Sequence, residues 1–149
     1  MPNNQTKIIE PLAKFHARLD KEGRVAIPKA IRDAIGLDKN DYVEVIIRKI
    51  KIDRANRQII VLRQAYLITR IGAKGLIFLP SDLKKQFDLH EKDIVEVVLY
   101  GFHKFDELVS EKGKQLLDKV QSVGKWSELK PEDKFPEDQS MEHFTYVFV

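Results

Sequence analysis

Five basic residues near the N-terminus have side chains suited to binding phosphate and guanine: Arg18, Lys21, Arg24, Lys29 and Arg32. Arg18 and Arg24 lie on either side of a predicted turn that contains Lys21, whereas Lys29 and Arg32 are about one helical turn apart. The planar guanidinium group of arginine forms paired hydrogen bonds with phosphate oxygens and with the major-groove edge of guanine. The spacing therefore predicts a surface that binds double-stranded DNA.

The sequence leaves a structural interpretation open for these residues. Arg24 could pair with Asp20 across the turn, and Arg18 could neutralise a buried acidic neighbour. An isolated surface lysine often only keeps the surface hydrated and binds no ligand. In the second half of the chain, lysines would hold phosphates without sequence preference, because lysine lacks the planar fork of arginine. The second set of DNA-binding candidates consists of Lys14, Arg70, Lys74, Lys84 and Lys85.

The pattern of apolar residues predicts short, stiff elements for the first set. Residues 14 to 20 alternate between apolar and polar side chains, as in a half-buried strand, and residues 24 to 27 resume a strand. We expect Gly23 to take a positive φ in the turn between them, giving a hairpin with charged residues at its tip. A helix of about two turns should begin at Pro28 and end at Gly36.

The stretch from residue 18 to residue 45 returns in altered form 52 residues later, from 70 to 97. A repeat of this length indicates a duplicated supersecondary unit. The identical pairs are Arg18/Arg70, Gly23/Gly75, Pro28/Pro80, Leu37/Leu89, Asp41/Asp93 and the Val-Glu-Val runs at 43–45 and 95–97, whereas Asp20, Arg24 and Arg32 become Gly72, Leu76 and Lys84. The repeat predicts a common core beneath polar surfaces that differ.

The repeat divides the chain into an N-terminal arm (1–13), a first unit (14–64), a second unit in the same barrel (65–102) and a C-terminal region (103–149). Within the first unit, strands at 42–47 and 59–62 should pair as a second hairpin. The C-terminal region is predicted to contain a helix over 106–120 and an acidic tail. Its apolar last nine residues predict a terminal strand at a sheet edge of this chain or of a partner.

The first copy carries a pattern made of Asp20, Gly23-Arg24, an apolar strand from Val25 to Ile27, Pro28, Arg32, Gly36-Leu37, Asp41 and Val43 to Val45. This pattern resembles that of the AbrB/SpoVT swapped-hairpin family of prokaryotic DNA-binding proteins. The resemblance implies a mostly β fold with short helices (α+β), in which two tandem units interleave their hairpins into one swapped-hairpin β-barrel. It also implies a transcriptional regulator whose first hairpin and helix meet DNA. The second copy matches the scaffold but lacks the Gly-Arg pair.

Charge and composition narrow the classes of function. Residues 1 to 102 hold 19 Lys and Arg against 13 Asp and Glu, whereas residues 103 to 149 hold 7 against 10, so a basic body precedes an acidic tail. The chain has no cysteine, its four histidines lack the spacing of metal ligands, and no nucleophile or phosphate-loop motif occurs. We therefore expect a cytoplasmic protein that is no enzyme and uses no metal or cofactor.

Two other functions stay open. The acidic residues 126 to 142 would suit an antitoxin resembling the MazE type, whose barrel binds an operator while its C-terminal segment wraps a toxin. A sequence-independent architectural DNA-binding protein is the second alternative. The expected partners are double-stranded DNA, a second copy of the chain, and a protein bound through the C-terminal region, with no membrane. The barrel could close within one chain or between two.

Overall fold

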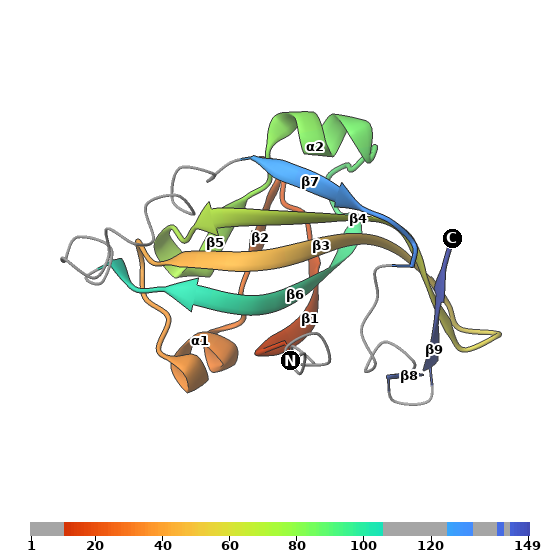
Figure 1. Cartoon of the computed structure of the whole chain (residues 1–149), viewed down its shortest axis with the longest axis horizontal. Coiled ribbons are helices and arrows are strands. Elements are labelled where there is room, and N and C mark those ends of the chain that lie inside the picture. The colour runs from red at the N-terminus through yellow and green to blue at the C-terminus, as the bar shows by residue number, and fades with distance from the viewer. Residues whose placement is uncertain (1–10, 106–124, 133–139, 142–143) are drawn as a thin grey trace, which may run out of the picture.

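The computed structural model describes residues 11–105, 125–132, 140–141 and 144–149, which form a mostly β protein with short helices (Figure 1). This confirms the predicted class. The elements are β1 (Ala13–Arg18), β2 (Arg24–Ala26), α1 (Lys29–Ile35), β3 (Tyr42–Asp53), β4 (Gln58–Arg70), the 3-10 turn η2 (Ala73–Gly75), β5 (Leu76–Phe78), α2 (Ser81–Gln86), β6 (Ile94–His103), β7 (Trp126–Leu129), β8 (Ser140–Met141) and β9 (Phe144–Phe148). None of the helices in the described residues is both long and apolar enough to cross a membrane.

Two sheets form in place of the expected closed barrel. The larger sheet has the order β1-β6-β3-β4-β9-β8, with β7 also paired to β4, and the smaller one is a two-stranded ribbon of β2 and β5. In the described residues the larger sheet has two ends, so its hydrogen bonds do not close a barrel. The physical reason is that β2 and β5 are three residues each and pair only with each other. They cannot link the outer strands of the larger sheet.

The prediction that the first two strands pair with each other as a hairpin is wrong. β1 pairs with β6 and β2 pairs with β5, so no ladder joins β1 to β2. The turn between them is nevertheless tight, because the backbone N–H of Asp20 donates to the carbonyl of Arg24 and that of Gly23 donates to the carbonyl of Asp20, both at 3.0 Å. Gly23 has a φ of 76°, as predicted. The second hairpin is confirmed by the β3–β4 ladder, although β4 continues to Arg70 as one strand.

The strand pairings repeat at the same offset of 52 as the sequence. Arg18 of β1 pairs with Ile94 of β6. The residues 52 positions away in the other copy, Arg70 and Tyr42, pair in the same way in the β3–β4 ladder. The ribbon obeys the same rule, since Arg24 faces Phe78 and Ala26 faces Leu76. The strand pairings of the described residues are therefore related by an internal approximate two-fold symmetry.

Asp41 and Asp93 show why some residues are identical in the two copies. The Oδ2 atom of Asp41 accepts a hydrogen bond from the N–H of Asp38 at 2.8 Å, and Oδ2 of Asp93 accepts one from the N–H of His90 at 2.8 Å. Each carboxylate thus closes the turn before a central strand. These residues are architectural.

The main hydrophobic core lies between the ribbon and one face of the larger sheet. Strand residues alternate between faces, so Val45 and Ile47 enter this core while Ile46 and Arg48 point to the opposite face. From the ribbon the core receives Val25 and Ile77. The helices contribute unequally, because α2 buries Leu83 whereas α1 has no fully buried residue. Figure 1 shows α1 and α2 at opposite sides of the molecule.

The described parts of the C-terminal region pair with this chain's own sheet. β7 runs antiparallel to residues 64–67 of β4, and β9 runs parallel to residues 58–61 of the same strand. The predicted terminal strand is thus confirmed, and it adds to this chain. The predicted helix over 106–120 and residues 1–10 of the N-terminal arm lie outside the described residues.

Candidate nucleic-acid interface

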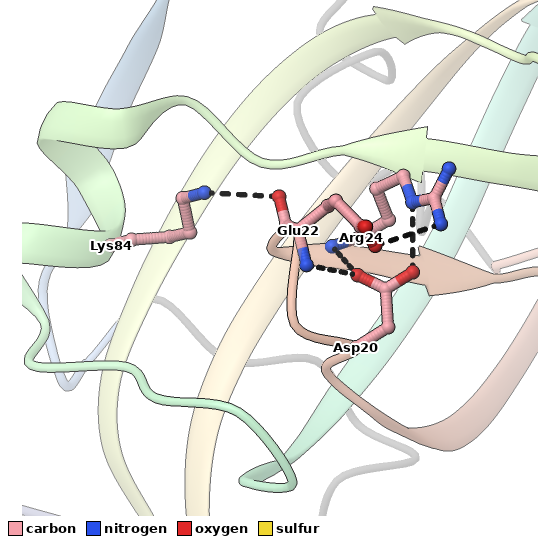
Figure 2. Close-up of polar contacts among 4 residues, drawn as sticks. All are labelled: Asp20, Glu22, Arg24 and Lys84. Carbon is pink, nitrogen blue, oxygen red and sulfur yellow. Dashed lines mark hydrogen bonds and ion pairs between the residues drawn. The ribbon is translucent and has the colours of Figure 1, made fainter.

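Arg24 is held by two carboxylates at the first turn, which we define as residues 20–23. Its Nε atom donates to Oδ2 of Asp20 at 2.8 Å, and its Nη2 atom donates to Oε2 of Glu22 at 3.0 Å (Figure 2). The other oxygen of Asp20 accepts the backbone N–H of Arg24 at 2.8 Å and that of Glu22 at 3.0 Å. The expected pairing of Arg24 with Asp20 is confirmed.

The hydrogen bonds to Asp20 keep its carboxylate ionised. Burial raises the pKa of Asp20, but the backbone and side-chain hydrogen bonds and the positive charge of Arg24 outweigh this, so the pKa lies below its usual value. Because the pair is about one third exposed, it adds little to stability. Its consequence is orientation: the guanidinium of Arg24 is fixed in one direction at the molecular surface.

Helix α2 of the second copy brings two more cations to the first turn. The Nζ atom of Lys84 donates to the carbonyl of Glu22 at 3.4 Å, and Figure 2 shows its side chain reaching the turn from α2. Lys21, Lys84 and Lys85 line one open groove of about 550 Å³ between the turn and α2. Acidic residues and a histidine line it as well, namely Asp20, Asp88, Glu91 and His90. Candidates that are far apart in the sequence thus meet at one place.

Arg32 has a structural role at the second turn, which comprises residues 72–75. Its Nε atom donates to the carbonyl of Ile27 at 3.0 Å, and its side chain lies where a Cβ atom on Gly75 would stand. At the first turn, Lys84, the counterpart of Arg32, lies in the same way against Gly23, the counterpart of Gly75. Lys29 and Lys74 are both exposed, on α1 and η2 respectively, and α1 contacts η2.

The remaining predicted cations lie apart from this groove. Arg18 is exposed and its Nη1 atom donates to the carbonyl of Lys92 at 3.3 Å, so in the described part of the chain it neutralises no buried acid. Arg70 donates from Nη2 to Oδ1 of Asn40 at 2.5 Å. The Nζ atom of Lys14 lies 4.7 Å from the centre of the Tyr146 ring. Lys14 therefore packs beneath the terminal strand.

A buried polar row across the larger sheet was missed by sequence reasoning. Arg48 and Glu96 are fully buried and paired at 2.9 Å. Arg48 also donates to Gln64 at 2.8 Å, while Glu96 Oε2 is bonded by His16 at 2.9 Å and by the Tyr146 hydroxyl. Burial alone would raise the pKa of Glu96. The hydrogen bonds from its neighbours and the positive charge of Arg48 have the larger combined effect, so the pKa lies below its usual value.

The terminal strand explains why this polar row is buried. Phe148 of β9 lies over the Arg48 guanidinium, whose Cζ atom is 5.3 Å from the ring centre, and Tyr146 packs with Ile59 and Val61. Two features of the sequence indicate such a buried row: Arg48 interrupts a strand rich in β-branched residues, and the chain ends in an apolar segment. In the described residues no group of three His, Cys, Asp or Glu side chains is arranged to hold a metal ion.

Comparisons with known proteins bear on the fold alone. No protein-family model matches the sequence, and no curated protein matches it. Among solved structures, the chain is similar to the solution structure of PHS018 from Pyrococcus horikoshii, with 27% sequence identity and a TM-score of 0.52. The similarity covers 64% of this chain and 96% of that one. It supports a mostly β fold over about two thirds of the chain.

Proposed function

We propose that this chain is a double-stranded DNA-binding protein, acting as a transcriptional regulator of the AbrB/SpoVT swapped-hairpin type in a prokaryotic cytoplasm. The observation that carries the proposal is the fixed guanidinium of Arg24 at a turn that also forms one wall of a groove, which is lined by Lys21, Lys84 and Lys85 together with Asp20, Asp88 and Glu91. Fixed arginines suit base edges, whereas mobile lysines suit phosphates. The two features occur together at one turn.

The two kinds of cation have different tasks in this proposal. Asp20 and Glu22 carry two negative charges beside the single positive charge of Arg24, so this cluster is a poor phosphate clamp. It is suited instead to a bidentate contact with guanine in the major groove, which depends on orientation more than on net charge. Lys21, Lys84 and Lys85 then contact the phosphate backbone and release counterions.

The repeated strand register supports the family part of the proposal. Each copy supplies strands to the other, as interleaved units would, and the ladders repeat at the offset of 52. We propose that the two copies are tandem swapped-hairpin units that interleave without a continuous ring of hydrogen bonds. Strands β7 and β9 of the C-terminal region pair with β4 of this chain, which favours a regulator over an antitoxin with an extended tail.

A salt titration tests the proposal. Fluorescence anisotropy of a labelled random-sequence duplex should show binding whose log K falls steeply with log salt, with a slope of about −2 to −3 for three lysine contacts. A slope shallower than about −1 would contradict electrostatic binding. Excess unlabelled genomic fragments then separate the alternatives: a regulator retains a subset of fragments, whereas an architectural protein is displaced equally by all of them.

A further inference from the structure

The β2–β5 ribbon presents an arginine and a phenylalanine side by side on its outer face. Val25 and Ile77 are buried at 1% and 0% exposure, so their neighbours in each strand point outward. Arg24 and Phe78 are direct cross-strand partners. Phe78 is 58% exposed, and the centre of its ring is 5.5 Å from Cζ of Arg24.

The pairing of these two residues arises from two differences between the copies. The counterpart of Arg24 in the second copy is Leu76, and the counterpart of Phe78 in the first copy is Ala26. Because the ribbon is antiparallel, both larger side chains fall at one end and the pair Ala26 and Leu76 falls at the other. One end of an otherwise two-fold ribbon therefore combines a fixed cation with an exposed aromatic ring.

A guanidinium and an apolar ring at this spacing match two groups in the major groove. Arginine binds guanine through O6 and N7, and apolar side chains contact the C5-methyl group of thymine. Neighbouring bases of one strand are about 3.4 Å apart along the helix axis, which is within reach of side chains on opposed strands. A two-stranded ribbon is also narrow enough to enter this groove.

We propose that Phe78 determines sequence specificity by contacting a thymine methyl group next to the guanine contacted by Arg24. The proposal rests on the proposed function and deepens it: the ligand is duplex DNA that presents guanine and thymine at neighbouring base pairs. Phe78 supplies apolar contact, and Asp20 and Glu22 keep the Arg24 fork in register with the ring.

Replacement of thymine by uracil tests this contact, because uracil lacks only the methyl group. Duplexes selected from a random pool by the unmodified protein are prepared with thymine or with uracil, and their affinities are measured by anisotropy. The unmodified protein should bind the uracil form about fourfold more weakly at the contacted position, as expected for one buried methyl group. Phe78→Ala should bind both forms equally, whereas Leu76→Ala, at the other end of the ribbon, should keep the fourfold difference.

The outcomes separate this proposal from the function on which it rests. If Phe78→Ala retains the fourfold preference while Arg24→Ala loses affinity, the thymine contact is overturned and DNA binding stands. If the unmodified protein binds no duplex, both fall. If Phe78→Ala instead changes the molar mass in solution and leaves the preference intact, the ring is a protein contact and the proposal is overturned. Circular dichroism confirms that each variant is folded.

Discussion

The first and second turns share a closing backbone hydrogen bond and a glycine at positive φ, but they differ in side chains and in backbone at Lys74, whose φ is 59°. At the first turn the N–H of Asp20 donates to the carbonyl of Arg24, and at the second the N–H of Gly72 donates to the carbonyl of Leu76 at 2.8 Å. Only the first turn carries a carboxylate and a guanidinium at these positions. The comparison teaches that this hydrogen bond and the glycine form without a carboxylate, whereas at the first turn Asp20 adds two hydrogen bonds from the backbone N–H groups of Glu22 and Arg24. The guanidinium of Arg24, which is replaced by Leu76 at the second turn, is therefore not needed to close the turn.

The central strands show the reverse difference between the two copies. Glu44 and Glu96 are counterparts, and Glu96 lies beneath β9 with no exposed surface, whereas the side chain of Glu44 is 16% exposed. The Glu44 carboxylate accepts a hydrogen bond from the Tyr66 hydroxyl at 2.7 Å and lies 2.8 Å from Nε2 of His103. The first copy thus carries the Arg24 cluster, and the second copy supplies the buried acid.

The largest effect should come from breaking the buried ion pair. Glu96→Ala leaves the Arg48 guanidinium buried without its partner and should lower the free energy of unfolding by about 3–5 kcal/mol. Glu44→Ala, the matched variant, removes a hydrogen-bonded but more exposed acid and should cost about 1–3 kcal/mol. Urea denaturation measures both. Equal losses would show that β9 does not distinguish the two acids.

The two turn glycines should differ in their tolerance of alanine. Both have a positive φ, which costs a non-glycine residue about 1–2 kcal/mol. A Cβ atom on Gly75 would also lie 2.9 Å from the backbone carbonyl of Ile27, whereas the three atoms nearest to one on Gly23 belong to the flexible end of Lys84. Gly75→Ala should therefore lower the melting temperature more than Gly23→Ala does. The opposite order, seen by calorimetry, would contradict the close contact expected between a Cβ atom on residue 75 and the Ile27 carbonyl.

The smallest effect concerns the phosphate contacts. Lys84→Ala should weaken binding to all duplex sequences and make the slope of log K against log salt shallower by about one. Lys51→Ala is the matched control, since Lys51 is exposed on β3 and lies outside the groove. An unchanged slope for Lys84→Ala would remove Lys84 from the interface.

Local features of the fold could be predicted from the sequence. Gly23 and Gly36 both have the positive φ that their positions in the pattern require, and the β3–β4 hairpin pairs as its β-branched runs indicate. The pairing of Arg24 with Asp20 was also accessible, because the two residues lie at the ends of one turn. In each case the determining contacts are near in the chain.

Contacts between distant residues could not be predicted in this way. Alternation shows which residues of β1 face inward, but it does not distinguish β2 from β6 as the partner. For the same reason, the packing of Lys84 against the first turn and the pairing of Arg48 with Glu96 required the structure. Each depends on how the second copy lies against the first, which the sequence period alone does not specify.

The central claim is that the first copy contacts DNA through Arg24. The most direct test compares the duplex affinities of Arg24→Ala and Leu76→Ala, which truncate counterparts on the same ribbon. Arg24→Ala should lose about tenfold or more in affinity at an unchanged melting temperature, because one base contact is removed. Leu76→Ala should bind as the unmodified protein does. Equal affinities for the two variants, with both folded, would contradict the account.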